Sequence, residues 1–587
     1  MKKKSKSLKE TFSLAYQNFK KKDFKAAEIL CNKILNIDPN NFDTIFLLST
    51  LLAVSKNFEE SKKLLNKAIN LDPNNVAAHN NLGNVQKELK NFKEAIKSYE
   101  KTIQINPKHA NAYFNLGVLS YELKEFRKAI NYFQKVIKIQ PNYANAHFNL
   151  GNAHVESKEF YKAISYYKKA IEINPKYIGA HNNLGLTFRG LNDFKNAISC
   201  YEKTIKINPG HGGTHHNLAL AFKELGEFNK AISSHELGIK YEPKNLVHYY
   251  YLIELKKDIL NSDLKNKIKK ILDDESSTVR NIRNRAYGNY LLSKYENKIK
   301  NYKKELDYLI AGHKYFFETK KEKFKLGLKY CFEDVIQISE SAHLNQSSKK
   351  NIEEIEPIFI IGVPRCGSTL VEKIITSGEK VIPAGEETSV LEHFVNQKIL
   401  QKQSLNLGNP EDLRAELFDI YKQKGLILEK NKNIFTDKSL NNFFYINLIK
   451  EIFPNAKVIN CRRDALSSIV SIFQNNLTEL AWTHDLENIF KYFDNYFRII
   501  ENFKKKYTKF IYELNFEQLV SNPEEESKKM MKFCRLSWDK KCLEFYKRKD
   551  LISKTTSNIQ IRRPIYKHSL DKYLPYKFFL GKYGKKY

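Results

Sequence analysis

A loop able to cradle an anion follows the apolar run "PIFII". Gly362 and Gly367 lie five residues apart and Ser368 and Thr369 follow directly, so backbone N–H groups and hydroxyls gather in one turn. A turn of this kind before a helix favours phosphate, because the amides and the positive end of the helix dipole converge on the anion. Arg365 adds a planar cation within the loop.

The spacing of the two glycines matches the phosphate loop of nucleotide hydrolases, but the residue after Gly367 is Ser368. Those hydrolases need Lys at this position. Without it, cleavage between the β and γ phosphates loses its main point charge. A degenerate hydrolase loop is the alternative interpretation.

Charged residues that could take part in chemistry recur further along the chain. Glu386 and Glu387 are adjacent carboxylates, and Lys438 lies in a predicted turn between a strand and a helix. Arg463 ends the apolar segment "AKVINCRR", and Ser471 follows eight residues later on a predicted helix. The alternative for the two carboxylates is a solvated pair at the start of a helix.

The segments "GVPRCGSTL" and "GEET" resemble the sulfotransferase family, and above all its tyrosylprotein sulfotransferase branch, which carries GVPRSGTTL followed by GEET. The resemblance implies transfer of sulfate from 3'-phosphoadenosine-5'-phosphosulfate (PAPS), with adenosine 3',5'-bisphosphate as the product and no metal. It implies that the 5'-phosphate and the sulfuryl group are held by Arg365, Cys366, Gly367, Ser368 and Thr369. Cys366 stands where the family usually has Ser, so its backbone N–H is kept and the hydroxyl contact is lost.

Sulfuryl transfer needs a base for the acceptor hydroxyl and a cation or donor for the leaving oxygen. The resemblance implies that Glu387 is this base, with the adjacent Glu386 as the alternative. It also implies that Lys438 stabilises the transition state and that Ser557 reaches the bridging oxygen. Arg365 and Glu387 are separated by one residue more than the matching positions of the family, so a loop must absorb the extra residue.

The same resemblance indicates which residues would contact the rest of the nucleotide. Arg463 and Ser471 resemble the family's site for the 3'-phosphate. Phe516, in "YELNFEQLV", stands where Tyr is usual and would stack on adenine. In the tail, Gln560 would contact the adenosine and Lys572 the 3'-phosphate.

Five motif blocks in the family's order cover residues 355 to about 580. Near the end, Arg563 takes the place of the family's Lys before Pro564, and Arg562 is a further cation without an assigned role. The apolar runs before the loop and before Arg463 are typical of buried parallel strands. We therefore expect a P-loop-like three-layer α/β domain over residues 351–587, with a mostly parallel sheet and both phosphate sites at the carboxyl ends of adjacent strands.

The first 245 residues carry a strict 34-residue period. It is marked by Leu14, Leu48, Leu82, Leu116, Leu150, Leu184 and Leu218, by Phe24, Phe58, Phe92, Phe126, Phe160, Phe194 and Phe228, and by Pro39, Pro73, Pro107, Pro141, Pro175, Pro209 and Pro243. The pattern resembles seven tetratricopeptide repeats, which implies an all-α superhelix over residues 1–245. The resemblance also implies a groove for peptides or partner proteins. A structural role, such as homodimer formation or rigid spacing, is the alternative.

Asparagines precede the repeat Leu at Asn81, Asn115, Asn149, Asn183 and Asn217. They could bind an extended peptide in the groove or satisfy contacts between helices. Residues 246–350 keep helical periodicity without the repeat, which predicts a helical bridge. The segment "LNQSSKKNIEEIEP" is the candidate linker to the last domain.

Composition narrows the function classes. The net charge of +33, from 99 Lys plus Arg against 66 Asp plus Glu, favours an acidic partner, yet the Lys residues are spread along the chain with Asn and Ile, so we expect no nucleic acid. The seven cysteines lack metal or disulfide spacing and predict reduced structural thiols. No uninterrupted apolar run of about eighteen residues and no secretory signal is found, so we expect no integral membrane segment and a cytoplasmic protein.

Two function classes follow. The first is a PAPS-dependent sulfotransferase, with a protein tyrosine as the favoured acceptor and a glycan, glycolipid or small molecule as the alternative. An acidic acceptor peptide would suit both the repeats and the basic charge. The second class is a non-catalytic repeat scaffold that binds nucleotide. Retention of Glu387, Lys438 and Ser557 favours the enzyme.

Overall fold

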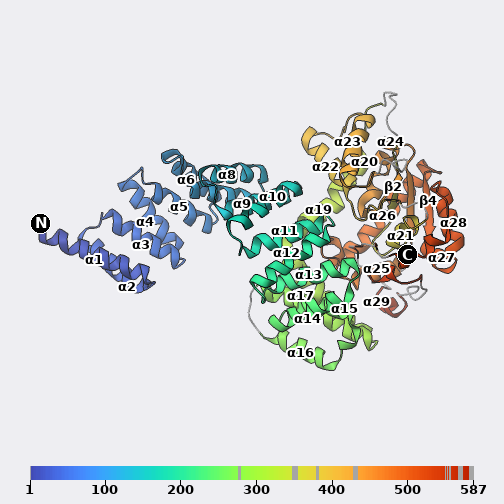
Figure 1. Ribbon diagram of the computed structural model, residues 1–587, viewed down its shortest axis with the longest axis horizontal. Coiled ribbons are helices and arrows are strands. Elements are labelled where there is room, and N and C mark those ends of the chain that lie inside the picture. Colours follow the sequence, from blue (N-terminus) through green and yellow to red (C-terminus); the bar gives the residue numbers. More distant parts are fainter. Residues whose placement is uncertain are drawn as a thin grey trace. The chain divides into compact units, whose positions relative to one another are not determined.

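The computed structural model describes residues 2–274, 279–346, 355–378, 382–427, 434–548, 550, 553, 555, 557–565 and 573–580 (Figure 1). The chain divides into two compact units, residues 1–218 and 219–587. The division falls within helix α13 (Gly212–Leu225), the first helix of the seventh repeat. The end of the repeat array therefore belongs to the same unit as the residues that follow it, 246–587.

The 34-residue period corresponds to seven helix pairs, as the sequence predicts. Each second helix begins at the recurring Phe. The pairs are α1 (Lys2–Lys20) with α2 (Phe24–Ile37), α3 (Phe42–Val54) with α4 (Phe58–Leu71), α5 (Val76–Glu88) with α6 (Phe92–Ile105), α7 (Ala110–Glu122) with α8 (Phe126–Ile139), α9 (Ala144–Glu156) with α10 (Phe160–Ile173), α11 (Ile178–Gly190) with α12 (Phe194–Ile207), and α13 with α14 (Phe228–Tyr241). A polar N-cap residue precedes the recurring Phe, and its side chain accepts a hydrogen bond from the first turn in α2 and α12.

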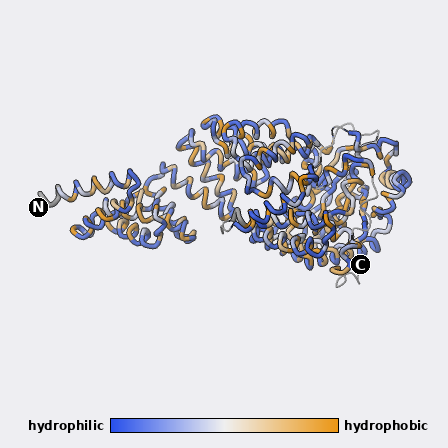
Figure 2. Tube along the Cα trace, turned by 90° about the horizontal axis from the view of Figure 1, so that it is seen from below, coloured by the Kyte–Doolittle hydropathy of each residue, from blue (hydrophilic) through white to orange (hydrophobic). Residues whose placement is uncertain are grey.

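The two helices of a repeat pack closely because the first one carries a glycine at the contact. A Cβ atom on Gly151 would lie 2.5 Å from the Tyr167 ring, and the same relation holds between Gly83 and Tyr99. Hydrophobic and hydrophilic residues alternate along these helices in Figure 2, so each helix has an apolar face to bury. Stacking therefore completes the core of each repeat.

Two of the repeat asparagines donate to asparagines of the preceding repeat. The Nδ2 atom of Asn115 donates to Asn84 Oδ1 (3.0 Å), and Asn183 Nδ2 donates to Asn152 Oδ1 (2.9 Å). These bonds favour the second of the two roles that the sequence leaves open, contacts between helices.

The predicted bridge is helical in its described parts. Its helices are α15 (Leu246–Leu255), α16 (Ser262–Asp273), α17 (Val279–Lys298), α18 (Tyr302–Thr319), α19 (Lys321–Lys329) and α20 (Val335–Ser341). Their buried side chains belong to the same hydrophobic cluster as those of the sheet that follows. The bridge and the sheet therefore share one core. Most of the candidate linker, residues 347–354, lies outside the described residues.

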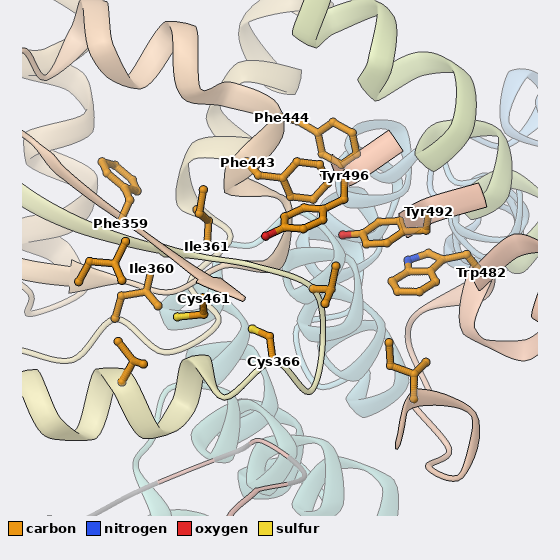
Figure 3. Packing of buried hydrophobic residues seen from close by; sticks show 14 of the residues in the cluster. Phe359, Ile360, Ile361, Cys366, Phe443, Phe444, Cys461, Trp482, Tyr492 and Tyr496 are labelled. Carbon is orange, nitrogen blue, oxygen red and sulfur yellow. The ribbon is translucent and has the colours of Figure 1, made fainter. Parts of the chain in front are cut away.

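A parallel sheet forms the core of the last region, as predicted. Strands β1 (Glu356–Ile361), β2 (Ile434–Asp437), β3 (Lys457–Arg462) and β4 (Ile511–Asn515) are ordered β2-β1-β3-β4. All three pairings are parallel, with Phe359 opposite Asp437, Ile361 opposite Asn460 and Arg462 opposite Asn515. Phe359, Ile360 and Ile361 lie within the apolar packing around the sheet (Figure 3).

Helices follow the carboxyl ends of the strands. α21 (Ser368–Ile375), α25 (Ala465–Phe473) and α27 (Phe516–Ser521) come directly after the β1 loop, β3 and β4. The remaining helices are α22 (Val390–Lys402), α23 (Pro410–Gln423), α24 (Ile446–Ile452), α26 (Leu486–Lys506), α28 (Pro523–Phe533) and α29 (Lys577–Leu580). In the described parts of the chain, no helix combines the length and the apolar character that crossing a bilayer requires.

Candidate functional site

The loop between β1 and α21 has the backbone of an anion-binding turn. Gly362, Arg365 and Gly367 have φ angles of 148°, 69° and 98°, in the region that favours glycine. A Cβ atom on Gly362 would lie 2.8 Å from the Cys461 carbonyl oxygen, so the loop passes β3 too closely for any side chain there. α21 begins at Ser368 and directs its first amides toward the loop.

Arg365 joins two predicted residues that lie far apart in the sequence. Its Nε atom donates to Ser471 Oγ (3.1 Å), and its Nη1 atom donates to Ser557 Oγ (3.0 Å). Ser471 comes from α25 and Ser557 from the tail. The structure therefore brings the loop, the predicted 3'-phosphate site and the tail together around one guanidinium.

Arg463 and Phe516 cover the other side of the loop. Arg463 Nη1 donates to the Arg365 carbonyl oxygen (3.1 Å), and its guanidinium lies 5.1 Å from the centre of the Phe516 ring. A Cβ atom on Gly367 would clash with the Phe516 ring, so this aromatic side chain packs directly against the loop. A cavity lies beside these groups, lined by the predicted residues Arg365, Gly367, Ser368, Thr369, Arg463, Phe516, Ser557 and Gln560 and by Arg563 and Pro564.

Cys366 is buried and turns its sulfur toward Cys461 on β3 (Figure 3). A hydrogen bond from the Cys461 thiol lowers the pKa of Cys366, although burial opposes the shift. Its backbone amide, which the resemblance assigns to phosphate, donates to the Val363 carbonyl oxygen (3.3 Å) within the loop. All seven cysteines are free and buried, as expected of structural thiols.

A separate cluster of charges lies at the carboxyl end of β2. The Lys438 Nζ atom lies 2.7 Å from Glu387 Oε1 and 3.9 Å from Glu386 Oε1. The backbone fixes this arrangement, because the Glu387 amide donates to the Lys438 carbonyl oxygen (2.7 Å) and the Lys438 amide donates to Gly385 (2.9 Å). Burial lowers the pKa of Lys438, but the neighbouring carboxylates outweigh burial and raise the pKa above its ordinary value.

The two adjacent carboxylates have different surroundings. Glu386 exposes 11% of its side chain, accepts a hydrogen bond from Ser553 Oγ (2.8 Å) and lies 3.4 Å from Lys373 Nζ. Burial raises the pKa of Glu386, yet Lys438, Lys373 and Ser553 together hold it below its ordinary value. Glu387 exposes 36% of its side chain. Glu386 is thus enclosed by partners, and Glu387 is the accessible carboxylate.

Sequence reasoning missed three members of this cluster. They are Glu372 and Lys373 on α21, and Ser553 in the tail. Glu372 is fully buried and its Oε1 atom accepts from Thr436 Oγ1 (2.9 Å). A signal was present, because two charged residues interrupt the apolar face of the helix in "TLVEKII". The chain between Arg365 and Glu387, in which a loop is expected to absorb one extra residue, includes residues 379–381, which lie outside the described part.

Residues 357–540 match the model of the sulfotransferase family. The chain carries a sulfotransferase-family domain. Residues 75–142, 144–177 and 179–211 match tetratricopeptide-repeat models, and residues 20–102 match the model of anaphase-promoting complex subunit 3. The chain thus joins tetratricopeptide repeats to this domain.

Several curated relatives share parts of the chain. An uncharacterized protein of Aquifex aeolicus (strain VF5) is 30% identical, over 50% of this chain and 40% of its own length. Protein-tyrosine sulfotransferase A of Caenorhabditis elegans is 27% identical, over 35% of this chain and 56% of its own. Protein-tyrosine sulfotransferase 1 of Danio rerio is 26% identical, over 37% of this chain and 65% of its own. The chain spans less than two thirds of the length of these relatives.

Among solved structures, a crystal structure of MamA protein is 26% identical, with a TM-score of 0.28, and covers 29% of this chain and 93% of its own. The sulfotransferase-family match ends at residue 540, before Ser557 and Gln560. The structure nevertheless places both residues at the cavity, beside the loop between β1 and α21. Lys572 lies outside the described residues.

Proposed function

We propose that this chain transfers the sulfuryl group of PAPS to a hydroxyl acceptor, and that the acceptor is a protein tyrosine. The observation that carries the proposal is the Arg365 guanidinium, which donates to both Ser471 and Ser557 beside a cavity. Each serine lies more than 100 residues from Arg365 in the sequence, yet both meet its guanidinium. Two arginines, the amides of α21 and several hydroxyls form a set of donors suited to phosphate and sulfate oxygens.

The residues around the cavity fit a 3',5'-bisphosphorylated adenosine. Arg463 and Ser471 would hold the 3'-phosphate, Phe516 would stack on the base, and Ser368 and Thr369 at the start of α21 would hold the 5' side. When bound, PAPS supplies the sulfuryl group and a bisphosphate leaving group. No step requires a metal.

The carboxylate and lysine cluster would supply the proton chemistry. Glu387 takes the proton of the acceptor hydroxyl as the new oxygen–sulfur bond forms. Lys438 and Ser557 stabilise the charge that develops on the oxygen released when the old sulfur–oxygen bond breaks. Glu386 keeps Lys438 charged and in place, since its carboxylate helps to raise the pKa of this amine.

The tyrosine acceptor is supported by the similarity to two protein-tyrosine sulfotransferases and by the repeats. The repeats would recruit a protein that carries the acceptor or a separate partner. An acidic sequence around the tyrosine would suit the net charge of +33.

An acceptor panel tests this proposal. The full chain is incubated with sulfur-labelled PAPS, tyrosine peptides, the same peptides with Phe for Tyr, and hydroxyl-bearing glycans and small molecules. We expect label on the tyrosine peptides alone, with activity that survives a chelator. Label on a glycan alone would contradict the tyrosine acceptor, and no transfer to any hydroxyl would contradict the enzyme.

A further inference from the structure

Arg562, the tail cation to which the sequence assigns no role, caps a helix of the seventh repeat. Its Nη2 atom donates to the Glu224 carbonyl oxygen (3.2 Å), and its guanidinium lies 5.9 Å from the centre of the Phe228 ring. Glu224 is in the last turn of α13, where carbonyl groups have no partner within the helix. A cation at this end also favours the helix dipole. Both residues lie in the second compact unit, residues 219–587.

Asn558 is a second side chain of the tail that bonds to the end of α13, and it also bonds to other residues of the tail. It is 2% exposed, and its Nδ2 atom donates to the Glu224 carbonyl oxygen (3.4 Å) and to the carbonyl oxygen of Ser553. Its Oδ1 atom accepts from Arg562 Nε (3.3 Å). A buried amide with all of these partners holds one orientation, because a lost partner would leave a buried polar group unpaired.

Gly226, just after α13, leaves room for the arginine. Its φ angle is 82°, and a Cβ atom there would meet the guanidinium carbon of Arg562. Glycine is the usual residue at this position after a helix, because it adopts a left-handed conformation without strain. Here the Arg562 guanidinium also occupies the space that a side chain at position 226 would fill.

The segment fastened in this way carries residues of the proposed site. Ser553 Oγ donates to Glu386 Oε1 (2.8 Å), and Ser557 Oγ accepts from Arg365 (3.0 Å). One network of hydrogen bonds therefore runs from the Glu224 carbonyl oxygen through Asn558 and Ser553 to the enclosed carboxylate.

A second contact leads from the same turn of α13 toward the phosphate loop. Lys223 Nζ lies 2.6 Å from Glu254 Oε2 on α15. Burial raises the pKa of Glu254, but the charges of Lys223, Lys294 and Arg365 hold it below its ordinary value. The charge of the loop residue Arg365 thus contributes to holding the pKa of Glu254 down, after the larger effects of Lys223 and Lys294.

We propose that Arg562 and Asn558 are positioning residues, which fasten Ser553 and Ser557 of the tail to the end of α13. The seventh repeat is then a structural part of the active site rather than a spacer before it. Ligand binding at the site and the order of the last turn of α13 are coupled through these two side chains. The catalytic role of Ser553 and Ser557 rests on the proposed function. The attachment of the tail to the end of α13 can be measured without activity.

Hydrogen exchange in the full chain measures the attachment. The amides of Gln560 and Ile561, which both donate to the Ser557 carbonyl oxygen, are the reporters. We expect Arg562→Ala to speed their exchange roughly tenfold. Arg562→Lys should give an intermediate rate, since lysine keeps the charge but lacks the planar fork through which Arg562 donates to Glu224 and Asn558. Protection of β3 should be unchanged. Arg498→Ala, which removes an exposed partner of Glu340, is the matched control.

If Arg562→Ala also loses β3 protection, the lysine variant decides the outcome. Reporter rates in Arg562→Lys equal to those of the wild type would overturn the proposal, as would equal rates in a folded Arg562→Ala.

A ligand experiment tests the coupling and separates it from the proposed function. In the wild type, adenosine 3',5'-bisphosphate should slow exchange of the Gly226 and Glu227 amides, which bond to carbonyls of α13. In Arg562→Ala the nucleotide should still bind, but this slowing should be lost, and kcat should fall more than affinity. A wild type that fails to bind the bisphosphate refutes the proposed function. A wild type that binds it without slowing these amides refutes the coupling.

Discussion

The Nζ atom of Lys438 lies 2.7 Å from Glu387 Oε1 and 3.9 Å from Glu386 Oε1, so two adjacent carboxylates share one buried cation. They do not share it equally. Glu386 also has Ser553 and Lys373 as partners, whereas Glu387 is the more exposed of the two. This difference in surroundings supports Glu387, rather than the alternative Glu386, as the proposed base.

Glu387→Gln should lower turnover about 10²–10⁴-fold, because the amide keeps the side-chain shape but cannot take a proton. Binding of adenosine 3',5'-bisphosphate should stay within about twofold of the wild type. Single-turnover rates with labelled PAPS, together with calorimetry, check both expectations. Glu340→Gln removes an exposed carboxylate on α20 and serves as the control. Unchanged transfer by the Glu387 variant would show that this carboxylate is not the base.

Lys438→Ala should lower turnover about 10²–10³-fold, since charge on the leaving oxygen would lose its cation. The proton acceptor stays in place, so the pH dependence of kcat should keep an acid limb that Glu387→Gln loses. A pH–rate profile for the two variants side by side measures this. Identical profiles would mean that the residues do not have separate roles.

Glu386 should contribute to stability at neutral pH and lose that contribution in acid. Its folded pKa lies below the ordinary value of 4.5, so its stabilising effect is present above that value and disappears as the pH falls through the folded pKa. In thermal unfolding between about pH 7 and pH 3, Glu386→Gln should have a lower Tm than the wild type at the neutral end. The two proteins should converge at the acid end. A difference that grows in acid would contradict this assignment.

The repeat glycines should be needed for packing. Gly151→Ala places a methyl group 2.5 Å from the Tyr167 ring and should destabilise the protein by about 1–3 kcal/mol through overpacking. Gly190→Ala is the matched control, because a Cβ atom there meets nothing within 4 Å. It should be neutral or stabilise by up to about 1 kcal/mol, since alanine has the higher helix propensity. Equal effects in denaturant unfolding would show that close helix approach is not the reason for Gly151.

The parts of the fold that follow from local pattern could be predicted. Seven helix pairs follow from a strict period, because each unit repeats the same apolar face and the same break before the recurring Phe. Strands β1 and β3 follow from short apolar runs, which are predicted to end in a glycine loop and in Arg463; β3 ends one residue earlier, at Arg462. The meeting of Arg365, Ser471 and Ser557 follows from motif resemblance alone.

The partners that enclose Glu386 could not be predicted, because Lys373 and Ser553 come from separate segments and meet it only after the domain packs. The same reason applies to Arg562, whose direction depends on a carbonyl 338 residues earlier in the chain. The repeat asparagines could bind a peptide or join helices. These two roles differ only in which group each side-chain amide contacts, and the sequence does not show that contact.

The proposed function depends most on a site for the 3'-phosphate at Arg463, and calorimetry with two nucleotides tests this site most directly. Adenosine 3',5'-bisphosphate should bind the wild type roughly 10- to 150-fold more tightly than AMP, because a charge-assisted contact contributes about 1.5–3 kcal/mol. Arg463→Ala should abolish most of this preference. Arg462→Ala, which removes the adjacent arginine paired with Glu501 and Glu513, should keep it. Equal affinity of the wild type for the two nucleotides would contradict a 3'-phosphate site at Arg463.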